Sequence, residues 1–161
     1  MAKMKVIVDA TVFVNFALIG REAILEKLFG DFCFTTEEVI KELHRGEERE
    51  ILPKSNRSWV KVLKVTTEEE YQSFILFNRR LGEGESSCLS LAISHNLNLL
   101  TDDLDTRKYA QRRGVSVSGT IGVLVVAVRG GIVSLEEGNR LLLGMIEKGY
   151  YSPCKKLNEL M

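Results

Sequence analysis

The sequence has no excess of charge of either sign and few cysteines. Its 161 residues include 22 Lys and Arg and 22 Asp and Glu, so the formal net charge is zero. Without an overall basic field, any contact with nucleic acid depends on a local patch. Cys33, Cys88 and Cys154 are far apart and show no zinc-ligand spacing. Three thiols cannot all pair, which favours a reducing cytoplasm.

Long apolar runs are also missing. The longest, residues 123–128, is far too short to span a membrane. Asp9 and Asn15 interrupt the N-terminal apolar run and no small-residue cleavage site follows it, so we expect no signal peptide and no membrane contact. The length is nevertheless sufficient for one domain with a sizeable core.

Short apolar runs alternate with helical patterns, which is typical of βαβ units and a parallel sheet. The sequence predicts strands at 4–8, 32–34, 98–101 and 115–117, with an edge strand at 59–65. It predicts helices at 11–19, 21–29, 36–44, 68–80, 84–95, 104–113, 120–129 and 135–147. We therefore predict an α/β fold, a three-layer α/β/α arrangement whose doubly wound, mainly parallel sheet has four to five strands.

Local signals mark several helix starts and one loop. Capping boxes are predicted for three pairs, Thr35 with Glu38, Thr67 with Glu70, and Ser134 with Glu137. The polar segment 46–58 predicts a loop, and Lys54, Arg57 and Lys61 are expected to form a basic cluster.

Acidic residues directly follow two predicted strands. Asp9 follows the first, and Asp102 and Asp103 follow the strand at 98–101. Ligands of parallel sheets gather beyond the carboxyl ends of the strands. Asp9 lies between two apolar segments, where an unpaired charge is costly, so a functional role is favoured. For Asp102 and Asp103, helix capping or simple solvation is an equal alternative.

Two predicted helices each offer a further acid. In the fifth helix, the periodicity points Glu85 inward at the N-terminal end and Glu83 towards solvent. In the third, Glu37 and Glu42 border the buried stripe equally well, whereas Glu38 is assigned to the capping box. Periodicity alone does not choose between Glu37 and Glu42.

Carboxylates that converge on one cleft repel each other unless cations neutralise them. A ligand set of oxygen atoms alone suits Mg²⁺ or Mn²⁺. Such ions polarise a phosphate and lower the pKa of a bound water molecule. The acids therefore indicate phosphoryl-transfer or nuclease chemistry.

Four segments together resemble a PIN domain, the fold of many VapC-type toxin ribonucleases: VIVDATVFVNF, EEVIKELHRG, GEGESSCLSLAISHNLNLLTDD and GVSVSGTIGVLVVA. They occur in the family's order, and their combination most resembles a poorly characterised prokaryotic PIN subgroup. The resemblance implies one PIN-like domain over 1–161, with a core at 4–130 and a C-terminal helical extension at 134–161. It also implies a metal-dependent endoribonuclease, the toxin of a toxin–antitoxin pair, with a protein antitoxin and a homodimeric state.

The resemblance assigns roles to individual residues. It maps the family's catalytic, metal-binding acids onto Asp9, Glu42, Glu85 and Asp103, with Asp102 a near-equal candidate for the last. It chooses Glu42 over Glu37, and it makes Thr11 and Thr101 supporting neighbours of the site. Glu85 stands where the family usually has Asp.

A basic group follows these acids: Arg107, Lys108, Arg112 and Arg113. If these residues lie near the cleft, they could hold RNA phosphates; the alternative is a solvated helix face. The segment SGTIG at 118–122 lacks the Lys and the glycine spacing of a P-loop and predicts a strand-to-helix turn with Thr120 near the cap. The main alternative to a nuclease is a catalytically silent PIN-fold module that binds RNA or a protein.

Overall fold

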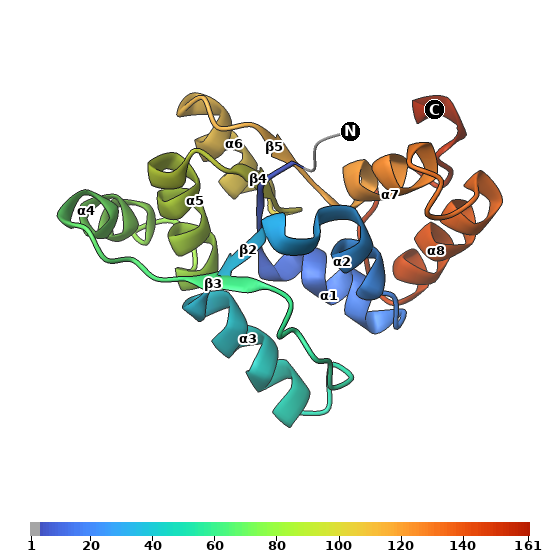
Figure 1. Cartoon of the computed structure of the whole chain (residues 1–161), viewed down its shortest axis with the longest axis horizontal. Helices are drawn as coiled ribbons and strands as arrows, with labels where there is room; N and C mark the ends of the chain where they lie inside the picture. Colours follow the sequence, from blue (N-terminus) through green and yellow to red (C-terminus); the bar gives the residue numbers. More distant parts are fainter. Residues whose placement is uncertain (1–3) are drawn as a thin grey trace.

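The computed structural model in Figure 1 describes residues 4–161, and these contain one parallel sheet. The strands are β1 (Val6–Val8), β2 (Cys33–Thr36), β3 (Lys61–Leu63), β4 (Asn98–Leu100) and β5 (Val117–Ser118). They form a five-stranded sheet in the order β3-β2-β1-β4-β5, and all neighbouring pairs are parallel. The chain builds outward from β1 to one edge and then returns to build the other, which confirms the predicted doubly wound sheet.

Helices cover both faces of this sheet. They are α1 (Ala10–Leu18), α2 (Ala23–Phe29), α3 (Glu37–Glu48), α4 (Glu68–Phe77), α5 (Glu83–His95), α6 (Leu104–Arg112), α7 (Thr120–Arg129) and α8 (Leu135–Glu147), with short 3₁₀ helices η1 (Gly30–Phe32) and η2 (Asn158–Leu160). Figure 1 shows α4 and α5 on one side of the sheet and α2, α7 and α8 on the other. The three-layer prediction is confirmed. Within residues 4–161, no helix combines the length and the apolar character needed to cross a membrane.

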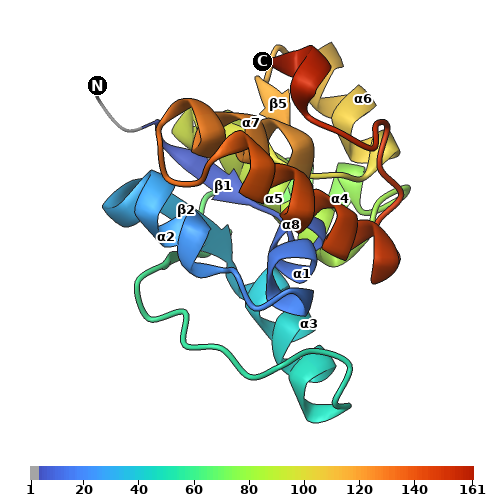
Figure 2. The same ribbon diagram turned by 90° about the vertical axis from the view of Figure 1, so that its right-hand side faces the viewer.

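The core is centred on β1, whose residues Val6, Ile7 and Val8 are fully buried. A central strand covered on both faces is apolar at every position rather than at alternate ones, which explains the continuous run at the N-terminus. Figure 2 shows α8 lying across α7 and α1, against which it packs. Leu142 of α8 and Leu157 of the following segment belong to the same core.

The structure corrects the predicted start of α3. Thr36, rather than Thr35, is the N-cap, and its hydroxyl accepts a hydrogen bond from the Val39 N–H at 3.2 Å. Thr35 lies in β2, where its hydroxyl donates to the Val8 carbonyl at 2.7 Å. The prediction was wrong by one residue because both positions hold threonine and the hydrogen bond to Val8 exists only in the folded sheet. Glu38 therefore takes no part in a capping box.

The other two capping predictions differ in outcome. Thr67 and Glu70 form the complete box at the start of α4. At α8, the Ser134 hydroxyl accepts from the Glu137 N–H, but the Glu137 carboxylate binds Arg21 at 2.8 Å instead of the cap. The second half of that box is lost because a cation competes for the carboxylate.

The predicted loop at 46–58 begins later than expected because α3 continues to Glu48. The predicted basic cluster of Lys54, Arg57 and Lys61 loses its central member, since only 5% of the Arg57 side chain is exposed and it pairs with acids. Arg57 pairs with Glu22 at 2.7 Å and with Glu47 at 3.4 Å. This buried network fastens the loop to α2 and α3, an outcome that local sequence does not encode.

Candidate active site

Asp9 lies at the carboxyl end of the central strand β1, in the N-cap position of α1. Its N–H donates to the Leu100 carbonyl at 2.9 Å, which continues the pairing of β1 and β4 and fixes its backbone. The residue is 1% exposed. Its Oδ2 accepts hydrogen bonds from Thr101 Oγ1 at 2.8 Å and from Thr11 Oγ1 at 3.3 Å. In the described part of the chain, no basic side chain forms an ion pair with Asp9.

The surroundings of Asp9 disfavour its charged form. Burial raises the pKa of Asp9 from its usual value of 3.8 to about 7. The hydrogen bond from Thr101 opposes this rise, while the negative charges of Glu85 and then Glu42 add to it. Without a cation, this carboxyl is therefore protonated for much of the time near neutral pH.

Glu42 of α3 and Glu85 of α5 are the acids that approach Asp9. A Cβ placed on Gly84 would lie 3.2 Å from Glu42 Oε1 and 3.8 Å from Asp9 Oδ1, so this glycine keeps open the space between the two carboxylates. Partial burial and the Glu85 charge raise the pKa of Glu42, and Arg45 opposes them. Glu85 is half-buried at the start of α5.

Glu37 lies in α3 together with Glu42 but has a different partner. It forms an ion pair with Lys64, at 3.4 Å, next to the edge strand β3. The structure thus places Glu42, not Glu37, beside Asp9, the choice that periodicity left open.

Glu38 is a further carboxylate near this group. It precedes Glu42 by one helical turn. Its Oε2 is buried and, among residues 4–161, has no hydrogen-bond partner. The pKa of the Cys88 thiol is raised by burial and then by the charges of Asp9, Glu85 and Glu38, which places Glu38 within electrostatic reach of the same region. Sequence reasoning missed it because the capping pattern supplied a sufficient structural role.

Both carboxylate oxygens of Asp102 accept hydrogen bonds from uncharged donors. Its Oδ1 accepts from the Thr120 N–H at 2.8 Å. Its Oδ2 accepts from Thr120 Oγ1 at 2.5 Å and from Asn15 Nδ2 at 3.1 Å. Asp102 thereby ties the turn after β4 to the first turn of α7 and to α1.

Asp103 is the N-cap of α6 and keeps one oxygen available. Its Oδ2 accepts from the N–H and hydroxyl of Thr106, at 2.9 and 2.7 Å. Its own N–H donates to Thr101 Oγ1 at 3.2 Å. No hydrogen bond reaches Asp103 Oδ1 from the residues that the structure describes.

The two predicted supporting threonines, Thr11 and Thr101, connect Asp9 to the turn after β4. Their hydroxyl oxygens are 3.4 Å apart, and Thr11 Oγ1 accepts from the Asp102 N–H at 2.9 Å. Since both hydroxyls also bond to Asp9 Oδ2, they hold one oxygen of Asp9 and leave Oδ1 on the side of Gly84.

Three polar residues without a predicted site role surround Asp102: Asn15, Thr120 and Tyr150. Asn15 interrupts the apolar sequence of α1, and a buried amide needs partners, so that interruption was an available signal. Burial and the Asp102 charge raise the pKa of Tyr150, and the positive charge of Arg107 opposes them. Tyr150 comes from the segment after α8, and only tertiary folding brings it here.

The four predicted RNA-binding residues do not form one group. Arg107, in the first half of α6, donates from Nη1 to the Thr101 carbonyl at 3.1 Å. Lys108 is exposed. The Arg112 guanidinium lies 5.8 Å from the Tyr109 ring centre, nearly one and a half turns further along α6.

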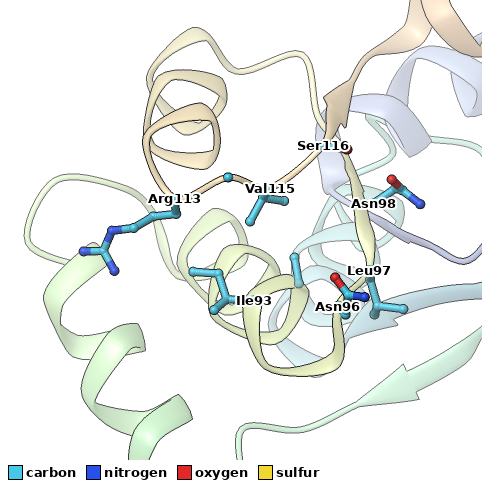
Figure 3. Close-up of a pocket in the computed structure, with 9 residues that line it drawn as sticks. Ile93, Asn96, Leu97, Asn98, Arg113, Val115 and Ser116 are labelled. Carbon is cyan, nitrogen blue, oxygen red and sulfur yellow. The ribbon is translucent and has the colours of Figure 1, made fainter.

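Arg113 lies at the opposite end of the sheet from the acids. With Asn98 and Ser116 it lines a pocket of about 150 Å³ at the amino ends of β4 and β5 (Figure 3). In Figure 3 the Arg113 side chain points away from Ser116 and Asn98, and its guanidinium lies 5.1 Å from the Phe77 ring centre. None of the described residues that line this pocket carries a carboxylate, so it is separate from the acidic site.

The acids do not form a ready-made metal cage. Within residues 4–161, no three Asp, Glu, His or Cys side chains are grouped as the ligands of a metal ion would be. The donor chemistry nevertheless fits a hard divalent cation, because the donors are oxygen atoms alone. Among the residues that the structure describes, the buried Asp9 has no cationic partner and Glu38 Oε2 has no hydrogen-bond partner, and a bound cation would relieve both conditions.

Comparison with known proteins agrees with this geometry. The family model DUF3368, described as a PIN domain, matches residues 5–161. The chain belongs to this PIN-domain family. A search of curated proteins found no match. PIN domains are generally nucleases and typically use divalent metal ions, so membership supports a nuclease-type function for this PIN domain.

Proposed function

We propose that this PIN domain is an endoribonuclease that hydrolyses RNA phosphodiester bonds with Mg²⁺ or Mn²⁺. The observation that carries the proposal is the state of Asp9. This carboxylate is buried at the end of the central strand, next to Glu85 and Glu42, and has no cationic partner among the described residues. Surplus negative charge in a site of this kind favours uptake of a divalent cation.

The residues present divide the work at such a site. Asp9, Glu85 and Asp103 would hold the metal, and Glu42 would complete the catalytic group. Thr101 and Thr11 orient Asp9 by donating to its Oδ2. When bound, a divalent ion polarises the scissile phosphate and lowers the pKa of a water molecule that attacks it.

We assign the metal ligand of the turn at 101–103 to Asp103 rather than Asp102. Asp103 has an oxygen without a described hydrogen bond, whereas both oxygens of Asp102 are committed to Thr120 and Asn15. Asp102 is then a structural residue that fixes the turn.

The paired variants Asp103→Asn and Asp102→Asn test this assignment. Asp103→Asn should weaken Mn²⁺ binding at least about tenfold with little loss of stability, because Asn is an equally good N-cap. Asp102→Asn should keep Mn²⁺ binding and lower the free energy of unfolding by about 1–2 kcal/mol, because charge-assisted hydrogen bonds become neutral ones. Calorimetric titration and urea unfolding measure the two effects. The reverse pattern would assign the ligand to Asp102.

The proposed activity itself is tested with a circular single-stranded RNA, which has no ends for an exonuclease. We expect the wild-type protein to linearise it with Mn²⁺ and to leave it intact with EDTA. A circular DNA of matching sequence should be cleaved more slowly. If calorimetry shows no Mn²⁺ binding and the RNA stays circular, the protein is instead a silent PIN-fold binding module.

We also propose that residues 1–161 form one domain. The extension at 134–161 supports this, because Leu142 and Leu157 pack into the same core as β1. The toxin role, the antitoxin and the homodimer stay predictions from the family resemblance, and the cytoplasmic location stays a prediction from the cysteine content.

A further inference from the structure

Arg107 differs from the other basic residues of α6 in how it is held. Its Nη1 donates to the Thr101 carbonyl at 3.1 Å, and it forms no ion pair within the described range 4–161. A guanidinium carries five N–H donors in a planar fork, so one bond to a carbonyl leaves several donors for another partner. The side chain is half-buried, which fixes its stem and keeps it partly accessible.

Thr101 connects Arg107 directly to the acidic site. The hydroxyl of Thr101 donates to Asp9 at 2.8 Å, while its carbonyl accepts from Arg107. The guanidinium and the buried carboxylate therefore lie on two sides of one residue. This arrangement suits a nuclease, because a positive group beside the metal-binding acids can hold the phosphate backbone.

Gly119 allows Arg107 to lie against the turn. A Cβ on Gly119 would be 2.9 Å from Arg107 Nη1 and 3.1 Å from the Thr101 carbonyl, and it would collide with Asp102. The backbone of Gly119 is extended, with φ of −138°, so close packing rather than backbone conformation requires the glycine here.

Asp102 lies close to Arg107 across Gly119, but the two side chains form no direct ion pair. Asp102 bonds to Thr120 and Asn15 instead. Tyr150 lies near both charges, since burial and then the Asp102 charge raise its pKa while the Arg107 charge lowers it. Arg107 is thus a fixed cation beside the acids with donors to spare.

We infer that Arg107 is the phosphate-binding residue of the nuclease site and that Arg112 and Arg113 take no part. The inference rests on the proposed function. The Arg107 guanidinium bonds to Thr101 with one nitrogen and to an RNA phosphate with the others. A lysine could make only part of these contacts.

The test compares Arg107→Gln, Arg107→Lys and the control Arg112→Gln, each in the Asp9→Asn background so that RNA stays uncleaved. Anisotropy of a fluorescein-labelled single-stranded RNA of mixed sequence measures binding. Arg107→Gln should weaken it about tenfold or more, and Arg107→Lys should recover part of the loss. The slope of log affinity against log salt concentration should fall by about 0.7 for Arg107→Gln, because one phosphate contact is lost.

Three results would overturn this inference. In the first, Arg107→Gln weakens binding no more than Arg112→Gln. In the second, the melting temperature falls while the salt slope is unchanged, which indicates a structural role through Thr101. In the Asp9-intact protein, Arg107→Gln should raise KM more than it lowers kcat. In the third result, Arg107→Gln cleaves RNA with an unchanged KM, which refutes the role of Arg107 but not the nuclease. If RNA binding depends on Arg107 but the wild-type protein does not cleave RNA, the proposed nuclease is refuted and the role of Arg107 in binding stands.

Discussion

Replacing Asp9 by Asn is expected to lower Mn²⁺-dependent cleavage of RNA about a thousandfold, equivalent to about 4 kcal/mol of transition-state stabilisation. Asp9 should have the largest effect among the acids because it is 1% exposed, whereas Glu42 is exposed and Glu85 and Asp103 are half-buried. A buried ligand is already held in place before the metal binds, so its loss should disturb the position of the metal more than the loss of a mobile ligand. Initial rates with a labelled RNA and matched protein preparations measure the change.

Two controls separate this effect from general loss of charge or fold. Asp105→Asn removes an exposed carboxylate next to the same turn and should leave the rate nearly unchanged. Glu83→Gln removes an exposed carboxylate at the start of α5 and should also leave the rate nearly unchanged. Glu85→Gln, in contrast, should lower the rate. Asn at position 9 has the size of Asp and can still accept from Thr101, so the variant should fold. Equal rates for Asp9→Asn and wild type would remove Asp9 from the catalytic group.

The sheet and the positions of its acids could be predicted because they follow from local patterns. Asp9 and the acids at 102–103 come directly after apolar strands, and parallel strands bring their carboxyl ends to one edge. Glu42 was separable from Glu37 only by family resemblance, since both border the same stripe. The structure separates them because Lys64 of a distant segment binds Glu37.

What could not be predicted depends on contacts between distant segments. Asp102 and Asp103 are adjacent residues of the same type, so the sequence does not distinguish them. In the structure, the hydrogen bonds from Thr120 and Asn15 to Asp102 do. The sequence assigns Arg57 to a basic cluster, but in the structure its buried guanidinium pairs with Glu22 of a distant segment. The split between Arg107 and Arg112 follows from helix direction, because α6 leads away from the strand ends as it proceeds.

The second large effect is on stability without metal. In EDTA, the free energy of unfolding should fall by about 2–3 kcal/mol between pH 5 and pH 8, because Asp9 has a pKa of about 7 when folded and 3.8 as its usual value. Between these values the folded state binds more protons than the unfolded state, so raising the pH removes stability. The raised pKa of Glu42 acts in the same direction. Urea unfolding at several pH values measures the slope.

Asp9→Asn should flatten this pH dependence and make the metal-free protein more stable than wild type at pH 8, since a neutral side chain replaces an unfavourable charge. Asp105→Asn should keep the wild-type slope. Glu70 does not interfere, because its pKa is lowered to about 2, so its contribution changes only in more acidic solution. Added Mn²⁺ should restore wild-type stability at pH 8 and have little effect on Asp9→Asn. A wild-type slope that survives in Asp9→Asn would show that Asp9 ionises without penalty and has no need of a cation.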